Sequence, residues 1–149
     1  MLASTASTNK SLEAIRNKEA GLNKRRVSML SRVPETGDWA AYKRNSIKNK
    51  DIAYLSAYTG DEFALLRGKN SDILFHGDAQ HCNFGDELIE LLLNKRVRLV
   101  AHTHPDFEEI FPSTDDRDFL KRIEQKDSVI VSSITGREKR FSANPFENM

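Results

Sequence analysis

The chain has 149 residues, of which 38% are hydrophobic and 30% are charged, and its formal net charge at pH 7 is +1. This length suffices for one domain with its own core and a short tail. No stretch approaches the roughly 20 apolar residues of a membrane-spanning helix, and the first residues lack the pattern of a secretory signal. Cys82 is the only cysteine, which excludes an internal disulfide and a thiol-rich zinc knuckle. We therefore expect a cytoplasmic protein without a membrane segment.

Charge divides the chain into two parts. Residues 1–50 contain 11 Lys and Arg against 4 Asp and Glu, whereas the remainder contains 12 against 18. We interpret residues 1–45 as a basic N-terminal arm and linker, and residues 46–149 as the folded body. Apolar residues at loosely helical spacing predict an amphipathic helix within residues 11–33, capped by Ser11 and weakened by Gly21. Because the apolar stripe is interrupted, we expect residues 1 to about 32 to be dispensable for folding.

Three consecutive basic residues, Lys24 to Arg26, stand out in the arm. Such a run is compatible with a nucleic-acid contact, but on a short helix it is typical of a solvated face. No feature of the arm reads a base sequence. We therefore expect no nucleic-acid contact there.

The body has the pattern of a mixed sheet with helices. After a polar connector at residues 43–50, three short apolar runs at 51–59, 62–68 and 71–77 predict an antiparallel meander. A helix follows at 85–95, then a strand at 96–102, a helix at 115–126 capped by Ser113 or Thr114, and a hairpin at 128–135 and 136–143. This order predicts an α/β (α+β) fold with a mixed β-sheet flanked by helices and preceded by a helical arm.

The stretch AHTHPDFEEIFPSTDD, residues 101–116, contains the residues best suited to chemistry. Side chains alternate along a strand, so His102 and His104 point to the same face at its end. Zinc binds imidazole nitrogen and carboxylate oxygen, and a catalytic site uses three protein ligands with one open position. The natural third ligand is Asp115 or Asp116, both at the start of the next helix. An isolated His-x-His pair is otherwise an ordinary feature of a polar loop.

These residues resemble the signature of the JAMM (JAB/MPN) zinc metalloproteases, in which HxHP is followed by a spacer and SxxD. The matching residues are His102, His104, Pro105, Ser113 and Asp116. The family also has a glutamate that opens an earlier strand of the form ExxxLLxG, which is matched by Glu62, Leu65, Leu66 and Gly68. The resemblance covers residues 60–135 and implies a JAMM/cytidine-deaminase-like fold. The usual histidine-to-aspartate spacing selects Asp115, whereas the SxxD relation selects Asp116, which we favour.

The resemblance implies a role for each residue. His102, His104 and Asp116 would bind Zn²⁺, and Glu62 would serve as the base that takes a proton from a zinc-activated water. Ser113 would donate a hydrogen bond to the oxyanion. The simpler alternatives are an ordinary strand glutamate for Glu62 and helix capping for Ser113. We expect no second metal site at His76, His81 and Cys82, whose spacing fits no ligand pattern.

The resemblance favours a zinc-dependent peptidase or isopeptidase that hydrolyses an amide bond in a protein or peptide substrate. The chain also looks similar to the JAB-like domains of phage minor head proteins. The alternatives are therefore a non-catalytic structural or interaction domain with phage structural proteins as partners, in which case the protein is virion-associated, and a toxin or effector module. The sequence does not specify the substrate.

Overall fold

The computed structural model describes residues 9–105 and 111–145 of the chain. Within these residues a six-stranded sheet has the order β1-β3-β2-β4-β5-β6, in which β4 and β5 are parallel and all other neighbours are antiparallel. The strands are β1 (Trp39–Lys43), β2 (Phe63–Gly68), β3 (Ser71–His76), β4 (Val97–His104), β5 (Asp127–Ser132) and β6 (Glu138–Ser142). The helices are α2 (Lys10–Arg16), α3 (Lys24–Arg32), α4 (Asn49–Thr59), α5 (Gly85–Leu93) and α6 (Thr114–Arg122). The predicted mixed sheet flanked by helices is confirmed.

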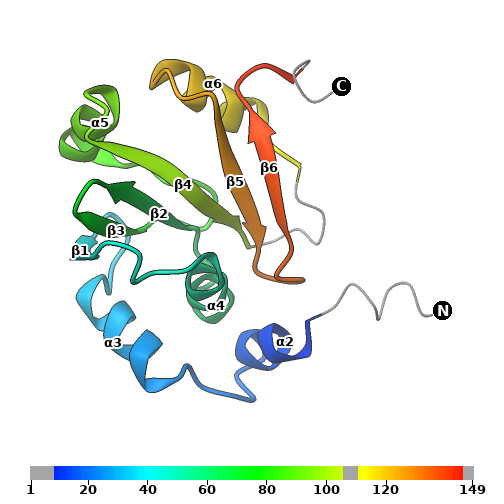
Figure 1. Ribbon diagram of the computed structural model, residues 1–149. Coiled ribbons are helices and arrows are strands. Elements are labelled where there is room, and N and C mark those ends of the chain that lie inside the picture. Colours follow the sequence, from blue (N-terminus) through cyan, green and yellow to red (C-terminus); the bar gives the residue numbers. More distant parts are fainter. Residues whose placement is uncertain (1–8, 106–110, 146–149) are drawn as a thin grey trace.

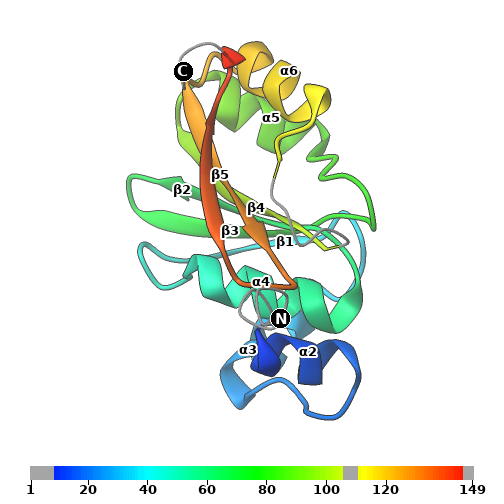
Figure 2. The ribbon, with the colours of Figure 1, turned by 90° about the vertical axis from the view of Figure 1, so that its right-hand side faces the viewer.

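The sheet separates two layers of helices, as the two ribbon views show (Figures 1 and 2). On one face, α2, α3 and α4 bury a core that includes Leu65 and Ala101 of the sheet. On the other face, α5 and α6 pack on a second core that includes Leu66 and Leu99. The alternation of side chains along each strand thus supplies both cores, as expected for a sheet covered on both sides.

The prediction of a strand at residues 51–59 is wrong, because this segment forms helix α4. The helix lies between the sheet and the arm, and residues around most of its circumference are buried, including Ile52, Leu55 and Ser56. A helix that is buried on most sides loses the 3.6-residue alternation by which helices are identified. The predicted connector at 43–50 also ends early, because α4 begins at Asn49, and the meander is reduced to the β2–β3 hairpin. The added strand β1 pairs with β3.

The arm forms two helices and not one. Asn9, rather than the predicted Ser11, caps α2 through a hydrogen bond from the Leu12 backbone N–H at 3.0 Å. Leu12 and Met29 are 1% and 3% exposed and belong to the same core cluster as α4. These contacts argue against a dispensable arm, because a truncation would expose the apolar surface of α4.

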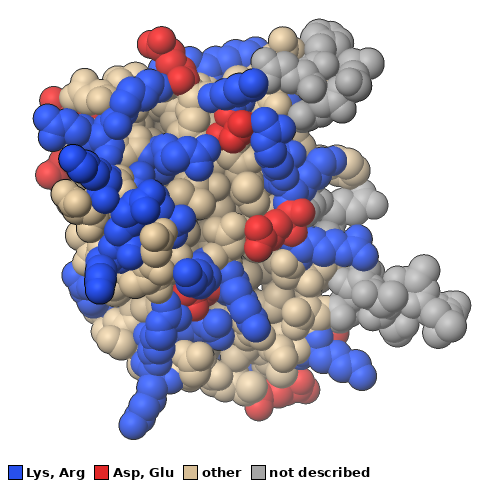
Figure 3. All heavy atoms as spheres, in the orientation of Figure 1, with Lys and Arg blue, Asp and Glu red and all other residues tan. Residues whose placement is uncertain are grey.

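The basic residues of the arm serve partly to attach it. Arg25 and Arg26 of α3 both donate to the carboxylate of Asp51 in α4, at 2.6 and 3.1 Å. Burial raises the pKa of Asp51, but the hydrogen bond from Arg25 and those from the Lys48 backbone and Arg26 outweigh it, so the pKa is lowered. Lys and Arg side chains remain more numerous than Asp and Glu on the face drawn in Figure 3, including the region of α3 and β1. None of the described helices is long and apolar enough to cross a membrane.

A bulge in β4 determines which face its last residues occupy. Leu66 pairs with Leu99, but the preceding residue of β2, Leu65, pairs with Ala101, so Val100 is the extra residue. Leu99 and Ala101 consequently contribute to opposite cores although they are two residues apart. Beyond the bulge, His102 lies opposite Ala64, whose side chain belongs to the core beneath α5 and α6. Bulges re-aim side chains in this way and are frequent beside functional sites.

Candidate metal centre

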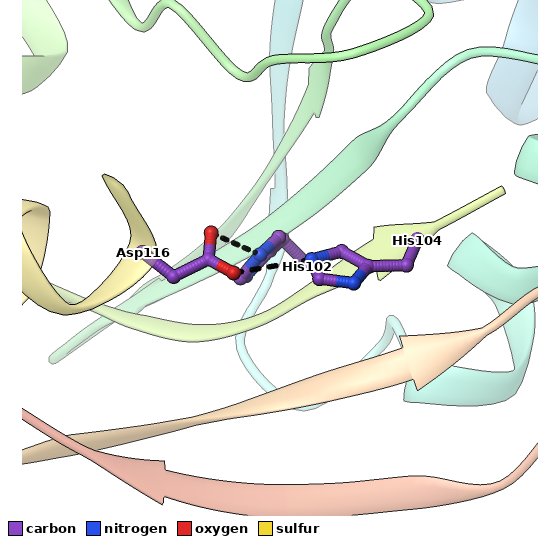
Figure 4. Close-up of side chains that lie close together, drawn as sticks. All are labelled: His102, His104 and Asp116. Carbon is purple, nitrogen blue, oxygen red and sulfur yellow. Dashed lines mark hydrogen bonds and ion pairs between the residues drawn. The ribbon is translucent and has the colours of Figure 1, made fainter. Parts of the chain in front are cut away.

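His102 and His104 end strand β4 and point together toward α6 (Figure 4). Their rings lie with centroids 5.1 Å apart at an interplanar angle of 63°. They are 5% and 8% exposed, so both rings sit in a largely dry environment. The same-face placement predicted from strand alternation is therefore present in the structure.

Asp116 completes the group from the first turn of α6. Its Oδ1 lies 3.0 Å from Nε2 of His102, and its Oδ2 lies 3.2 Å from Nε2 of His104. One ligand atom from each of the three residues can be chosen so that all lie within 4.8 Å of one another. Asp115 lines the same pocket but is exposed, and no contact to the histidines joins it to the group. The geometry supports Asp116 over Asp115 as the third candidate ligand.

The donor set suits zinc. Zinc with bonds of about 2.0–2.2 Å in a tetrahedral shell places neighbouring ligand atoms roughly 3.3 Å apart. The two imidazole nitrogens lie 3.0 and 3.2 Å from different oxygens of the Asp116 carboxylate, and one ligand atom per residue can be chosen within 4.8 Å of the other two. Two imidazoles and one carboxylate also leave a fourth position for water or substrate, as catalytic zinc sites do. The three residues thus fit the ion in kind and number.

The protonation of Asp116 supports this fit. Burial raises the pKa of Asp116, but hydrogen bonds from His102 and His104 and from the Ser113 backbone outweigh it and hold the pKa well below its usual range. The carboxylate is therefore the charged, metal-binding form at neutral pH.

His102 differs in one respect from most metal-binding histidines. Such a ring usually donates its second N–H to a carboxylate or carbonyl. The Nδ1 atom of His102 is buried and has no hydrogen-bond partner among the described residues. The ring packs edge-on against Phe141 instead, with centroids 6.0 Å apart. Packing, rather than a second hydrogen bond, fixes its orientation.

Glu62 is held beside this group by the loop after β3. Its backbone N–H donates to the carbonyl of Asp78, and its own carbonyl accepts from the N–H of Gly77, both at 2.7 Å. Gly77 permits this close approach, because a Cβ there would lie 2.5 Å from the carbonyl oxygen of His81. The Glu62 side chain is 8% exposed, lines the same pocket as the histidines, and accepts a hydrogen bond from the Cys82 thiol at 3.7 Å. Burial, together with the Glu62 carboxylate, raises the pKa of Cys82, so this thiol stays protonated.

Ser113 caps α6, as one of the two sequence interpretations predicts, and lies at the pocket. It is the N-cap of α6, where its Oγ accepts the Asp116 backbone N–H at 3.0 Å. It is exposed and also lines the pocket. Because the capping bond uses a lone pair of the oxygen, the hydroxyl proton remains available for donation into the pocket.

The pocket has a volume of about 430 Å³ and joins these polar residues to an apolar wall. The wall was not predicted from the sequence, since its residues come from four separate segments and carry no motif. Its members are Phe84, Leu99, Phe119 and Phe141.

The other two histidines are not members of the ligand group found among the described residues. His76 is 3% exposed, and both ring nitrogens are engaged at 2.7 Å, Nδ1 with the Val33 carbonyl and Nε2 with Asp61. Both partners are acceptors, so the ring connects the arm to β3 by hydrogen bonds. Neither ring nitrogen is left to bind a metal. His81 is exposed at the pocket rim.

Comparison with protein-family models, with curated proteins and with solved structures found no match to this chain.

Proposed function

We propose that the protein is a zinc-dependent peptidase or isopeptidase of the JAMM-like type, which hydrolyses an amide bond in a protein or peptide. The observation that carries this proposal is the convergence of His102, His104 and Asp116 at the end of β4, with Glu62 lining the same pocket. Neither a sheet core nor a helix cap requires two buried imidazoles that share one carboxylate. Three protein ligands of this kind, with a fourth position left open, are typical of a catalytic zinc site.

The proposed division of labour follows from the positions of the residues. Bound zinc would be held by His102, His104 and Asp116, and it supplies a nucleophilic water near neutral pH and polarises a carbonyl. Glu62 would accept the proton of the attacking water and return it to the leaving amine. A largely buried carboxylate that lines the pocket is suited to this work. It must reach the reacting water without binding the metal, and Glu62 lies outside the ligand group.

Ser113 would stabilise the negative charge that develops on the carbonyl oxygen. Its backbone position is fixed by the cap of α6, so its hydroxyl is oriented before the substrate binds. Such a preorganised donor is worth roughly 10² to 10³ in kcat where it has been removed from other enzymes.

The test combines metal analysis with hydrolysis on one sample. The full chain is loaded with zinc and dialysed, its metal content is measured, and a mixed peptide library is then incubated with it and examined by mass spectrometry. We expect one zinc per chain and new amine termini at defined amide bonds. The absence of zinc, or bound zinc with no cleavage in any member of the library, would contradict the proposal.

A further inference from the structure

We propose that the pocket beside the candidate metal centre takes an apolar side chain of leucine or phenylalanine size, next to an internal amide bond of the substrate. This inference rests on the proposed function, because it names the substrate class of the same site. It is argued from the apolar wall of the pocket, from the contact between that wall and a candidate ligand, and from the charges that line the pocket.

The apolar wall of the pocket is suited to bury a side chain of the substrate. Phe84, Leu99 and Phe141 line the pocket and are 6%, 3% and 1% exposed. Phe119 of α6 is half-buried and packs on Phe84 with ring centroids 5.5 Å apart. When an apolar group of a ligand covers such a surface in a concave site, water is displaced from both, and this displacement favours binding.

The wall begins directly beside the centre. The Phe141 ring packs edge-on against the His102 ring, with ring centroids 6.0 Å apart. His102 in turn shares the carboxylate of Asp116 with His104. When a substrate amide lies at the candidate metal centre, the side chain of the residue next to that amide lies against the apolar wall. A glycine in that place has no side chain to displace water from the wall. Each methylene gained or lost in such a pocket changes recognition by roughly 10- to 200-fold.

The charges of the pocket indicate an internal amide. No lysine or arginine is found among the described residues that line the pocket, whereas Glu62, Asp115 and Asp116 do line it. Even with Zn²⁺ bound, the charges of the ion and of these three carboxylates sum to −1, so a free carboxylate on the residue that occupies the wall would meet no net positive charge. The fitting substrate is thus an amide within a chain, and not the last residue of one.

Binding tests this inference without any need for turnover. The zinc-free and zinc-loaded full chains are titrated with N-acetyl-phenylalaninamide, N-acetyl-leucinamide and N-acetyl-glycinamide, and backbone NMR shifts are followed. We expect the first two to bind at least about tenfold more tightly than the glycine compound, with shifts at the end of β4 and in α6. Equal binding, or shifts confined to other elements, would overturn the inference.

Two variants localise the effect. Phe119→Trp enlarges a half-buried residue of the wall, and Ala79→Trp adds a ring at an exposed position that also lines the pocket. Either should reduce the preference to less than about threefold, and the Ala79 variant covers the case in which the first fails to fold. Lys121→Ala, exposed on α6 and outside the pocket, is the matched control and should keep the preference. A preference that survives both tryptophan variants would overturn the inference.

Hydrolysis separates this inference from the proposed function. Blocked peptides that differ only in Phe, Leu or Gly beside one amide are incubated with the zinc-loaded chain. A binding preference with no cleavage of any peptide would contradict the proposed function and support the pocket inference. Cleavage at equal rates for all three would support the proposed function and contradict the pocket inference. Tighter binding of N-acetyl-phenylalanine than of its amide to the zinc-free chain would also contradict the pocket inference.

Discussion

Ser113 and Asp116 cap each other at the start of α6: the Ser113 backbone N–H donates to Asp116 Oδ2 at 2.9 Å, and the Asp116 backbone N–H donates to Ser113 Oγ at 3.0 Å. The same carboxylate faces His102 and His104. The SxxD spacing therefore has two physical purposes, because a capping box fixes the helix start and also orients the carboxylate toward the imidazoles.

The first prediction concerns the identity of the aspartate ligand. Asp116→Asn should bind zinc at least about tenfold more weakly, since it removes the charged oxygen that faces both histidines. Asp115→Asn is the matched control at an adjacent, exposed position and should bind zinc as the wild type does. Zinc affinity is measured by competition with a chromogenic chelator. Loss of zinc in the Asp115 variant alone would show that Asp115, and not Asp116, is the ligand.

The second prediction concerns the histidines. The double variant His102→Ala, His104→Ala should retain no zinc after dialysis, because a single carboxylate cannot hold the ion against buffer. His81→Ala, which removes an exposed histidine from the rim of the same pocket, should retain one zinc per chain. Elemental analysis of all three proteins decides the matter. Equal zinc content in the double variant and the wild type would remove the histidines from the site.

The third prediction concerns Glu62→Gln, which keeps the size of the side chain but removes its basicity. We expect unchanged zinc content and a loss of roughly 10² to 10⁴ in amide hydrolysis, the usual contribution of a positioned acid or base. The melting temperature should change little. A variant whose activity falls only in proportion to its stability would indicate a structural strand glutamate instead.

The sequence could predict features that depend on short spacing. His102 and His104 share a face because strands alternate, and Ser113 caps α6 because a serine precedes a run with acidic residues in its first turn. The sequence pattern of residues 51–59 predicts a strand and not helix α4, because distant segments bury the helix on most sides and its apolar residues therefore show no helical spacing. The apolar wall of the pocket was missed for the same reason, since nothing near Phe84 or Phe141 in the sequence indicates that they meet.

The arm gives the fourth prediction. Leu12→Ala should lower the free energy of unfolding by about 2–5 kcal/mol, because the side chain is 1% exposed in the core beneath α4. Val27→Ala, at a position 53% exposed on α3, should change it by no more than about 0.5 kcal/mol. Chemical denaturation measures both. Removal of residues 1–32 should abolish the cooperative transition, and a truncated chain that melts like the full one would contradict this.

The fifth prediction concerns acid stability. Burial raises the pKa of Asp72, but hydrogen bonds from Arg67 and from the Ile47 backbone outweigh it and lower the pKa. A carboxylate with a lowered folded pKa stabilises the fold above about pH 4, its unfolded value, and this contribution is lost as the pH falls through the folded pKa. Asp72→Asn should therefore lose less stability than the wild type between neutral pH and about pH 3. Parallel curves for the two proteins would contradict this.

The bulge at Val100 decides on which side of the sheet the motif lies. If Val100 paired regularly and β4 had no bulge, strict alternation would turn His102 and His104 toward α4 and away from Asp116, while the letters HTHP would stay as they are. Such a chain would still match the motif in any sequence search, yet its imidazoles and its carboxylate would lie on opposite sides of the sheet. The motif alone thus does not encode the site, which also depends on how the residues before it pair with β2.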